Sequence, residues 1–128
     1  AEGIQMGTRF VATVEAEVHE NYKQCITKAK DIDSRVTGRA TGHPVRALRN
    51  KMTTEYIRLE KEGASFEELE HLTLGSLRKA VVDGDVKEGS VMAGQIAGLI
   101  ADIKPCKEAI ESIVSQAEAL LKGDQNHE

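Results

Sequence analysis

Apolar residues recur along most of this chain at intervals of three and four, which is the spacing that puts them on one face of a helix. Polar and charged residues fill the intervening positions, so the pattern predicts amphipathic helices with one buried face. No single apolar run is long enough to span a bilayer, which takes about 18 residues. The predicted helices cover residues 14–30, 51–62, 66–72, 77–82, 91–103 and 105–122.

Capping signals mark several of the predicted helix starts. Thr13 is placed to cap the helix at 14–30, with Glu15 in its first turn, where a carboxylate favours the positive end of the helix. Asn50 is placed to cap the helix at 51–62, and Ser65 opens a capping box before the next helix. Pro105 suits the first turn of the last helix.

A period of two, typical of strands, appears in three short stretches. Residues 3–8 place Ile4 and Met6 on one face of a strand. Residues 31–37 and 45–49 also alternate, and the glycine-rich stretch between them predicts a turn. We therefore expect one strand at the start of the chain and a short hairpin further on.

Glycines at two places leave alternative interpretations open. Gly7 and Thr8 end the first predicted strand with bare backbone N–H groups, which suit a phosphate, although a tight turn would also call for a glycine. Gly94 and Gly98 lie inside the predicted helix at 91–103, where each costs about 1 kcal/mol relative to alanine. Either close packing or an adjacent cofactor would explain why they are kept.

Three stretches of this sequence together resemble one family of flavoenzymes. They are residues 3–10 (GIQMGTRF), 42–50 (GHPVRALRN) and 84–98 (GDVKEGSVMAGQIAG). Each is similar to the FMN-dependent nitronate monooxygenases, formerly called 2-nitropropane dioxygenases, and to the FMN-dependent enoyl-[acyl carrier protein] reductases. The resemblance implies an α/β chain, mostly helical, that forms a C-terminal fragment of a (β/α)8 TIM barrel.

The resemblance also implies a division of the chain. Residues 1–17 would hold the last barrel strand and the start of the following helix, and residues 18–85 an inserted small α+β subdomain. Residues 86–123 would form the closing barrel helices, and residues 124–128 a disordered tail. Because a complete barrel needs about 250 residues, we expect this chain to be the C-terminal part of a larger enzyme.

Site residues are implied by the same resemblance. The family's catalytic histidine precedes the phosphate strand, so no catalytic residue is assigned within this chain. The implied contacts of the FMN phosphate are Gln5, Met6, Gly7 and Thr8. Gln95 is implied as a further contact of FMN, and Ser90 and Met92 as contacts of the substrate.

Met92 favours one of the two activities. Its apolar side chain suits a fatty enoyl chain better than a small nitronate. We therefore expect an enoyl-[acyl carrier protein] reductase of fatty acid synthesis that uses NADH to reduce trans-2-enoyl thioesters through FMN. A nitronate monooxygenase that oxidises alkyl nitronates with O2 is the alternative. A non-catalytic helical interaction fragment, built on residues 105–122, is the alternative from another class.

Composition and charge limit the classes of partner that we expect this chain to bind. A net charge of −4 with 30% charged and 40% hydrophobic residues is ordinary for a globular protein. The basic stretch between Asp33 and Glu55 predicts either a solvated face or a site for a nucleotide or acidic carrier protein. It has no aromatic residue for stacking on bases, which argues against nucleic acid. No membrane partner is expected, and a homodimer is compatible with the resemblance.

The cysteines predict a reducing compartment, and neither the cysteines nor the histidines predict a metal site. Cys25 and Cys106 lie far apart at apolar helical positions, which predicts buried reduced thiols in a cytoplasmic protein. The four histidines show none of the spacings typical of zinc sites.

Overall fold

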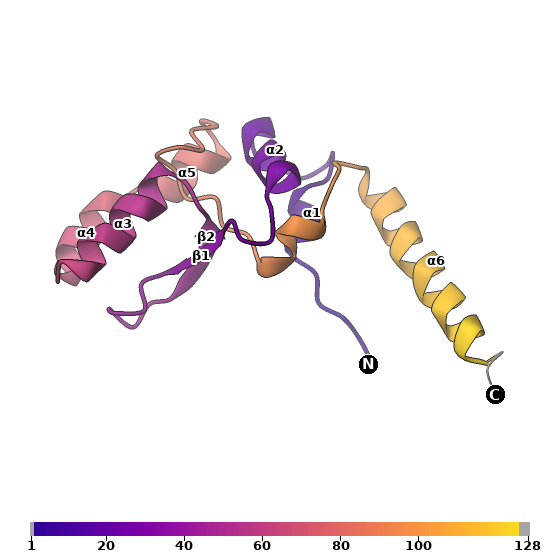
Figure 1. The fold of residues 1–128 in the computed structure, drawn as a ribbon. Coiled ribbons are helices and arrows are strands. Elements are labelled where there is room, and N and C mark those ends of the chain that lie inside the picture. Colours follow the sequence, from indigo (N-terminus) through magenta and orange to yellow (C-terminus); the bar gives the residue numbers. More distant parts are fainter. Residues whose placement is uncertain (1, 126–128) are drawn as a thin grey trace.

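The computed structural model describes residues 2–125 and shows a mostly helical chain with one two-stranded sheet (Figure 1). Helices α3, α4 and α5 gather at one end beside the hairpin, α1 and α2 lie in the middle, and α6 extends away from the other end. Over residues 2–125, no helix combines the length and apolar character that crossing a bilayer requires. The elements in order are α1 (Thr8–Val11), α2 (Glu20–Lys28), β1 (Ser34–Thr37), β2 (Val45–Leu48), α3 (Lys51–Lys61), α4 (Phe66–Thr73), α5 (Ser76–Val81), the 3-10 helix η1 (Gln95–Leu99) and α6 (Cys106–Gln125).

The predicted hairpin is confirmed. Strands β1 and β2 pair antiparallel, with Arg35 opposite Ala47. The turn between them needs a glycine at position 38, where φ is +80° and an added Cβ would lie 2.1 Å from the His43 carbonyl oxygen. The His43 amide closes the turn by donating to the Gly38 carbonyl at 2.9 Å.

Asn50 caps α3, as the sequence predicts, and also ties that helix to a distant loop. Its side-chain oxygen accepts from the Thr53 amide at 2.9 Å, and the Thr53 hydroxyl accepts from the Asn50 amide at 2.9 Å. Its Nδ2 donates to the carbonyls of Val86 and Gly89 at 2.8 and 2.7 Å. The predicted cap at Ser65 is confirmed too, by a 3.3 Å bond that its hydroxyl accepts from the Glu68 amide.

Two apolar clusters form the interior of the described chain. The larger one joins α2, β2, α5, η1 and the stretch before η1, and the smaller one lies between α3 and α4. Buried members of the larger cluster are Ala12, Tyr22, Ile26, Leu48, Ala80, Val91, Ala93, Ala97 and Ile100, and those of the smaller are Met52, Tyr56 and Leu69.

The prediction of a strand over residues 3–8 is wrong. Residues 2–6 have no regular structure, and Thr8 begins a short helix, α1, with Gly7 at its N-cap position. A strand is stable only when its N–H and C=O groups pair with a neighbour. Within the described residues, the sheet consists of β1 and β2 alone, so residues 2–6 have no strand to pair with.

The predicted start of the helix at 14–30 is also wrong. Thr13 makes a parallel bridge with Lys104, and the Val14 amide donates to the Lys104 carbonyl at 3.1 Å, which holds this backbone extended. Helix α2 begins only at Glu20, and the Nδ1 atom of His19 caps it by accepting from the Asn21 amide at 3.0 Å.

The predicted helix at 91–103 shrinks to the five-residue 3-10 helix η1. Val91 and Met92 pair with β2 instead, so their backbone is extended. Gly98 lies against the backbone of residues 30 and 31, where an added Cβ would be 2.6 Å from the Asp31 amide nitrogen. Close packing alone therefore explains this glycine.

The last helix is confirmed, but its cap comes from elsewhere. Both carboxylate oxygens of Glu15 accept from the Cys106 amide, at 3.1 and 3.0 Å, so the residue expected in the first turn of its own helix caps α6 instead. Much of the apolar stripe is exposed, Leu120 by 73%. The helix continues to Gln125, three residues past its predicted end, and residues 126–128 of the expected tail lie outside the described chain.

Both cysteines are free thiols, but neither is fully buried. Cys25 packs at the edge of the larger cluster, where burial raises the pKa of its thiol. A neutral thiol at this position behaves as a small apolar side chain.

Replacing Asn50 by alanine should lower the free energy of unfolding by about 3 kcal/mol. The variant loses the helix cap and leaves the carbonyls of Val86 and Gly89 without their donor. Ser65→Ala removes a cap alone and should cost about 1 kcal/mol. Urea unfolding of both variants tests this, and equal losses would show that the bonds to the loop contribute nothing.

Gly98→Ala should destabilise the fold by about 2 kcal/mol, because the new methyl group meets backbone that cannot move aside. Gly94→Ala is the matched control, since its nearest neighbour would be the Thr8 hydroxyl at an ordinary 3.5 Å. Its unfolding free energy should stay within about 0.5 kcal/mol of the parent. Thermal melting of both variants distinguishes the two glycines.

Candidate functional site

An extended segment at residues 90–94 brings together several of the residues singled out from the sequence. Its Val91 carbonyl accepts from the Leu48 amide at 2.8 Å, and Met92 bridges antiparallel to Ala47 in β2. The Tyr22 hydroxyl donates to the Met92 carbonyl at 2.7 Å. Burial raises the pKa of Tyr22, so this hydroxyl stays protonated and able to donate at neutral pH.

Ser90 is fixed by α5. Its amide donates to the Ser76 carbonyl at 2.9 Å, and the two hydroxyl oxygens lie 2.6 Å apart in a buried pair. Each hydroxyl thus has a partner, which removes the cost of burying it. Ser90 is therefore an anchored residue at the start of the segment.

Thr8 links the start of the chain to this segment across 86 positions of sequence. Its hydroxyl oxygen accepts from the Gly94 amide at 2.9 Å. Gln95, the first residue of η1, follows directly and is exposed. The structure thus places Thr8 beside Gln95, two of the residues expected at the cofactor.

Backbone donors near Thr8 are open. Within residues 2–125, the amides of Gly7, Thr8 and Arg9 donate to no protein acceptor. An added Cβ on Gly7 would have nothing within 4 Å, so a ligand can approach the backbone here. Three unused N–H groups with no side chain over them suit an anionic oxygen cluster such as a phosphate.

Arg9 is a positioning residue that the sequence reasoning missed. Its guanidinium donates to the Asp102 carboxylate at 3.1 Å, to the Asp102 carbonyl at 2.8 Å and to the Ala12 carbonyl at 2.8 Å. Its buried Nε has no acceptor among the described residues. These bonds hold α1 against the chain leading into α6. The only available signal was its position inside the 3–10 stretch.

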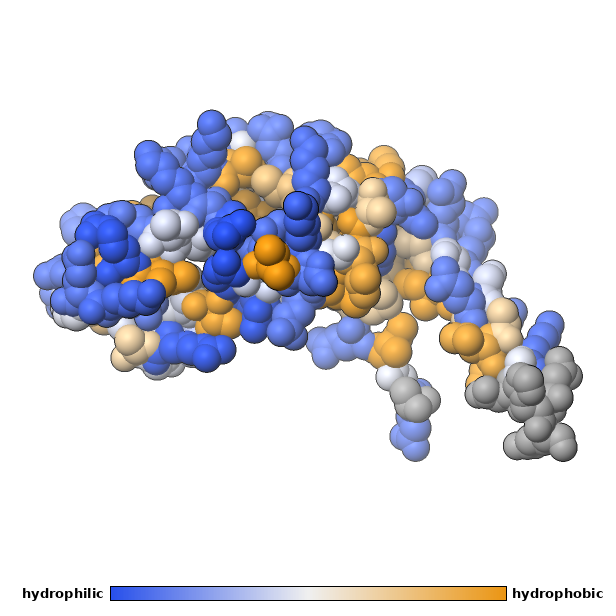
Figure 2. Space-filling view, viewed as in Figure 1, coloured by the Kyte–Doolittle hydropathy of each residue, from blue (hydrophilic) through white to orange (hydrophobic). Residues whose placement is uncertain are grey.

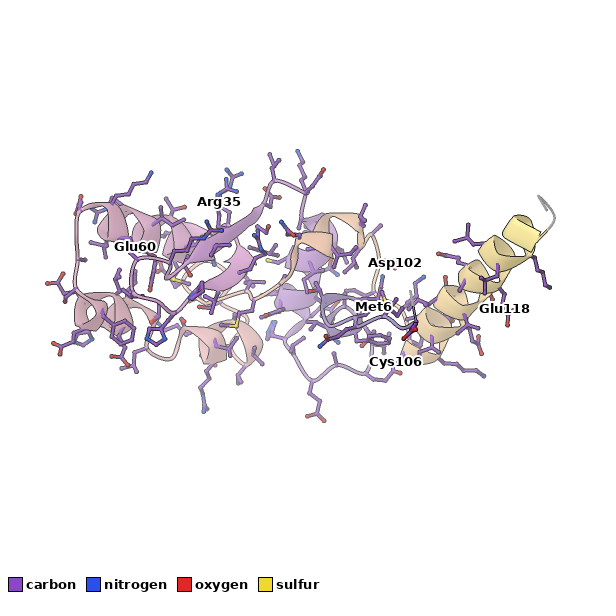
Figure 3. The ribbon with its side chains drawn as sticks, turned by 90° about the horizontal axis from the view of Figure 1, so that it is seen from below. Met6, Arg35, Glu60, Asp102, Cys106 and Glu118 are labelled. Carbon is purple, nitrogen blue, oxygen red and sulfur yellow. The ribbon has the colours of Figure 1, made fainter. Side chains whose placement is uncertain are left out.

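Met6 and Gln5 do not share the environment of Thr8. Gln5 is exposed, and Met6 lines an apolar groove of about 200 Å³ between the start of the chain and α6. Figure 3 shows Met6 near Asp102 and Cys106, at the first turn of α6. The other residues that line the groove are Ile4, Phe10, Ile110, Ile113 and Val114.

A larger cavity of about 440 Å³ lies between β2, α3, α4, α5 and the segment at 90–94. Ser90 and Met92 both line it, so the structure brings together the two residues expected at the substrate. His43 also lines it, with its ring 5.0 Å from that of Phe66. Sequence spacing gave no sign of this cavity, because its walls come from elements far apart in the chain.

Two arginines of the basic stretch, Arg35 and Arg49, line a different groove of about 490 Å³, together with Arg58 and Lys61 of α3. Figure 3 shows Arg35 by the hairpin, well away from Met6. Arg58 pairs with two carboxylates, those of Glu55 and Glu62, and Arg49 pairs with another. Carboxylates of the described residues therefore offset part of the positive charge along this groove.

A family model described as nitronate monooxygenase matches residues 1–116 of this chain. The chain belongs to the nitronate monooxygenase family. The three stretches on which the sequence resemblance was based fall within the matched region, so that prediction is confirmed.

Relatives carry more than one activity in their names. A probable nitronate monooxygenase from Staphylococcus saprophyticus is 28% identical over 94% of this chain and 34% of its own length. A 5-hydroxy-7a-methyl-1-oxo-octahydro-1H-indene-4-carboxyl-CoA dehydrogenase from Mycobacterium tuberculosis is 27% identical over 91% of this chain and 43% of its own.

Solved structures that are similar to this chain also bear the names of different enzymes. FabK from Thermotoga maritima is 44% identical, with a TM-score of 0.92 over 100% of this chain and 40% of its own. Nitroalkane oxidase from Streptomyces ansochromogenes is 28% identical, with a TM-score of 0.67 over 92% of this chain and 33% of its own. The chain thus spans between a third and somewhat less than half of the proteins it matches.

Thr8→Val should release the Gly94 amide while keeping the shape of the side chain. Loss of the acceptor leaves a part-buried donor unpaired, which costs about 1–3 kcal/mol. We expect faster hydrogen exchange at Gly94, measured by NMR, and a lower unfolding free energy. Thr8→Ser keeps the hydroxyl and should protect this amide as the parent does. Equal protection in both variants would mean that the bond does not form in solution.

Proposed function

We propose that this chain is the C-terminal part of a (β/α)8-barrel flavoenzyme and that it holds the phosphate end of FMN. In this proposal residues 1–17 lead from the last barrel strand into the next helix, residues 18–85 form an inserted subdomain, and residues 86–123 close the barrel. The family match and the partial coverage of the relatives support this division.

One observation carries the cofactor proposal, which is the group of unused amides at Gly7, Thr8 and Arg9 beside Gln95. We propose that the Gly7 and Thr8 amides bind phosphate oxygens and that the bond from Gly94 to Thr8 holds the two halves of the site together. Gln95 would add a contact from η1. Gln5 and Met6 would contact FMN only with a different path of residues 2–6 from the one seen here, where Met6 lies against α6. When bound, FMN supplies the hydride-transfer chemistry, and the protein orients it.

Within the family, we propose the enoyl-[acyl carrier protein] reductase activity, with NADH as the reductant. The similarity to FabK, an enoyl-[acyl carrier protein] reductase that is 44% identical, supports this reaction. Met92 supports it as well, because its side chain is 40% exposed on the wall of a largely apolar cavity, beside the buried Ser90. In this proposal, Ser90 and Met92 contact the substrate, and the catalytic histidine lies outside this chain.

The remaining assignments follow from that reaction. The substrate would be a trans-2-enoyl thioester on acyl carrier protein or a small-molecule thioester. The free thiols of Cys25 and Cys106 support a cytoplasmic location. A homodimer is compatible with this function.

Nitronate monooxygenase is the second candidate, because the family model and the Staphylococcus saprophyticus relative both bear that name. Two assays on the enzyme that contains this chain separate the candidates. One follows NADH consumption with a crotonyl thioester, and the other follows oxygen uptake with an alkyl nitronate. Turnover in the second assay alone would overturn the reductase.

Gly7→Asp should abolish FMN binding by the enzyme that contains this chain. The new carboxylate would occupy the open space over the amides and repel the phosphate. Gly3→Asp is the matched control, since Gly3 is equally open but lies outside the proposed contacts. Flavin absorbance per protein after purification measures the effect. Full flavin content in the Gly7 variant would remove these amides from the site.

A further inference from the structure

The groove of about 490 Å³ lies where α3 packs beside the hairpin, and cationic side chains from three elements line it (Figure 1). Arg35 comes from β1, and Arg49 directly follows β2. Arg58 and Lys61 lie three positions apart in α3, which puts them on one side of that helix. Among the described residues that line the groove, none is acidic. The fold thus brings positive charge from separate parts of the chain to one surface.

Two of these four cations have no carboxylate partner. The carboxylates that pair with Arg49 and Arg58 lie outside the lining of the groove. Among the side chains that the structure describes, neither Arg35 nor Lys61 forms an ion pair, and the Arg35 guanidinium donates to two nearby backbone carbonyls instead. A neutral carbonyl orients a guanidinium but does not cancel its charge. The groove therefore keeps positive charge that an acidic partner would meet.

The lining of the groove suits the surface of an acidic protein better than a nucleotide. No aromatic side chain is present among the described residues that line it, so a base would have no ring on which to stack. The side chains of Arg49 and Arg58 are 51% and 53% exposed, and an exposed ion pair contributes little by itself. Several carboxylates on one face of a protein would meet these spread cations together, which makes the two surfaces complementary in charge.

Thr53 connects this groove to the cavity proposed for the substrate. It lines both the groove and the cavity of about 440 Å³. Its side chain is buried and is held in the capping box with Asn50, so the start of α3 forms a fixed wall between the two hollows. A partner that docks in the groove would therefore lie next to the cavity that Ser90 and Met92 line.

We propose that this groove docks the acidic face of the acyl carrier protein that bears the enoyl thioester. The inference rests on the proposed reductase function and adds to it the surface that recognises the carrier. Docking here recognises the protein rather than the acyl group, so it favours a carrier-bound thioester over the same thioester on free pantetheine. Because the contacts are between exposed charges, they speed the encounter of the two proteins and weaken as salt rises.

Lys61→Glu, alone and together with Arg35→Gln, tests the docking surface. Lys61 is exposed in the last turn of α3, so reversing its charge disturbs few contacts. In the enzyme that contains this chain, kinetics are measured at low salt with crotonyl-[acyl carrier protein] and with crotonyl-pantetheine. We expect the KM for the carrier substrate to rise about threefold in the single variant and about tenfold in the double variant, with kcat unchanged. The KM for crotonyl-pantetheine should stay within about twofold of the parent, because no carrier is present to dock.

Lys79→Glu is the matched control. Lys79 is also exposed in the last turn of a helix, α5, but it does not line the groove. Its variant should leave the KM for the carrier substrate unchanged. An unchanged KM in the double variant would overturn the proposal, and so would an equal rise in Lys79→Glu. A rise in the KM for NADH without one for the carrier substrate would overturn it in favour of a nucleotide site.

Direct binding separates this inference from the proposed function. Calorimetric titration of the enzyme with acyl carrier protein should show about tenfold weaker binding in the double variant at low salt, with a smaller difference at high salt. Binding that the double variant loses, without enoyl reduction by the parent, would support the docking surface and overturn the reductase function. Reduction of the carrier substrate, with equal carrier affinity in parent and double variant, would support the reductase and overturn the docking surface.

Discussion

The extended segment at residues 90–94 is the constraint on which the arrangement of the molecule depends. Backbone pairing joins it to β2, the Tyr22 hydroxyl joins it to α2, and the Thr8 hydroxyl joins it to α1. Val91 and Ala93, which lie within it, are both buried in the larger apolar cluster. Ser76 joins it to α5 as well, so four separate elements bond to five consecutive residues, and loss of this segment would leave them without a common partner.

That segment also explains why packing and the candidate sites cannot be separated here. The side of the segment that pairs with β2 places Met92 on the wall of the cavity of about 440 Å³, and its far end places Gly94 beside Thr8. A glycine at 98 then allows η1 to pack directly on the backbone after α2. The same close packing that stabilises the chain thus sets the positions of the residues proposed to bind ligands.

Features set by neighbouring residues could be predicted from the sequence. The hairpin, the caps at Asn50 and Ser65 and the long last helix all depend on side chains within a few positions of one another. Features set by distant partners could not. Thr13 looked like a helix cap until its bridge to Lys104 extended the backbone, and Glu15 caps a helix that begins 91 positions later.

The candidate site shows the same division. The sequence resemblance singled out Thr8 and Gln95 separately, and the structure places them together through the bond to Gly94. It did not indicate Arg9, whose role depends on Asp102, nor the cavity of about 440 Å³, whose walls come from elements far apart in the chain. Helical spacing also predicted a helix over 91–103, because apolar and small residues recur there, but pairing with β2 outweighs a helix weakened by two glycines.

The exposed face of α6 fits a chain that spans only part of its relatives. Ala109 is buried, but Ile110, Leu120 and Leu121 are 52–73% exposed, and Figure 2 shows apolar surface along this helix and on the neighbouring part of the molecule. The groove between Met6 and α6 adds to this surface. In the proposed barrel, α6 is a closing helix and residues 2–6 belong to the last strand. Both would then pack against barrel elements that the longer relatives contain outside the matched region. Pairing with a neighbouring strand there would also hold residues 2–6 in the extended conformation that their alternation favours.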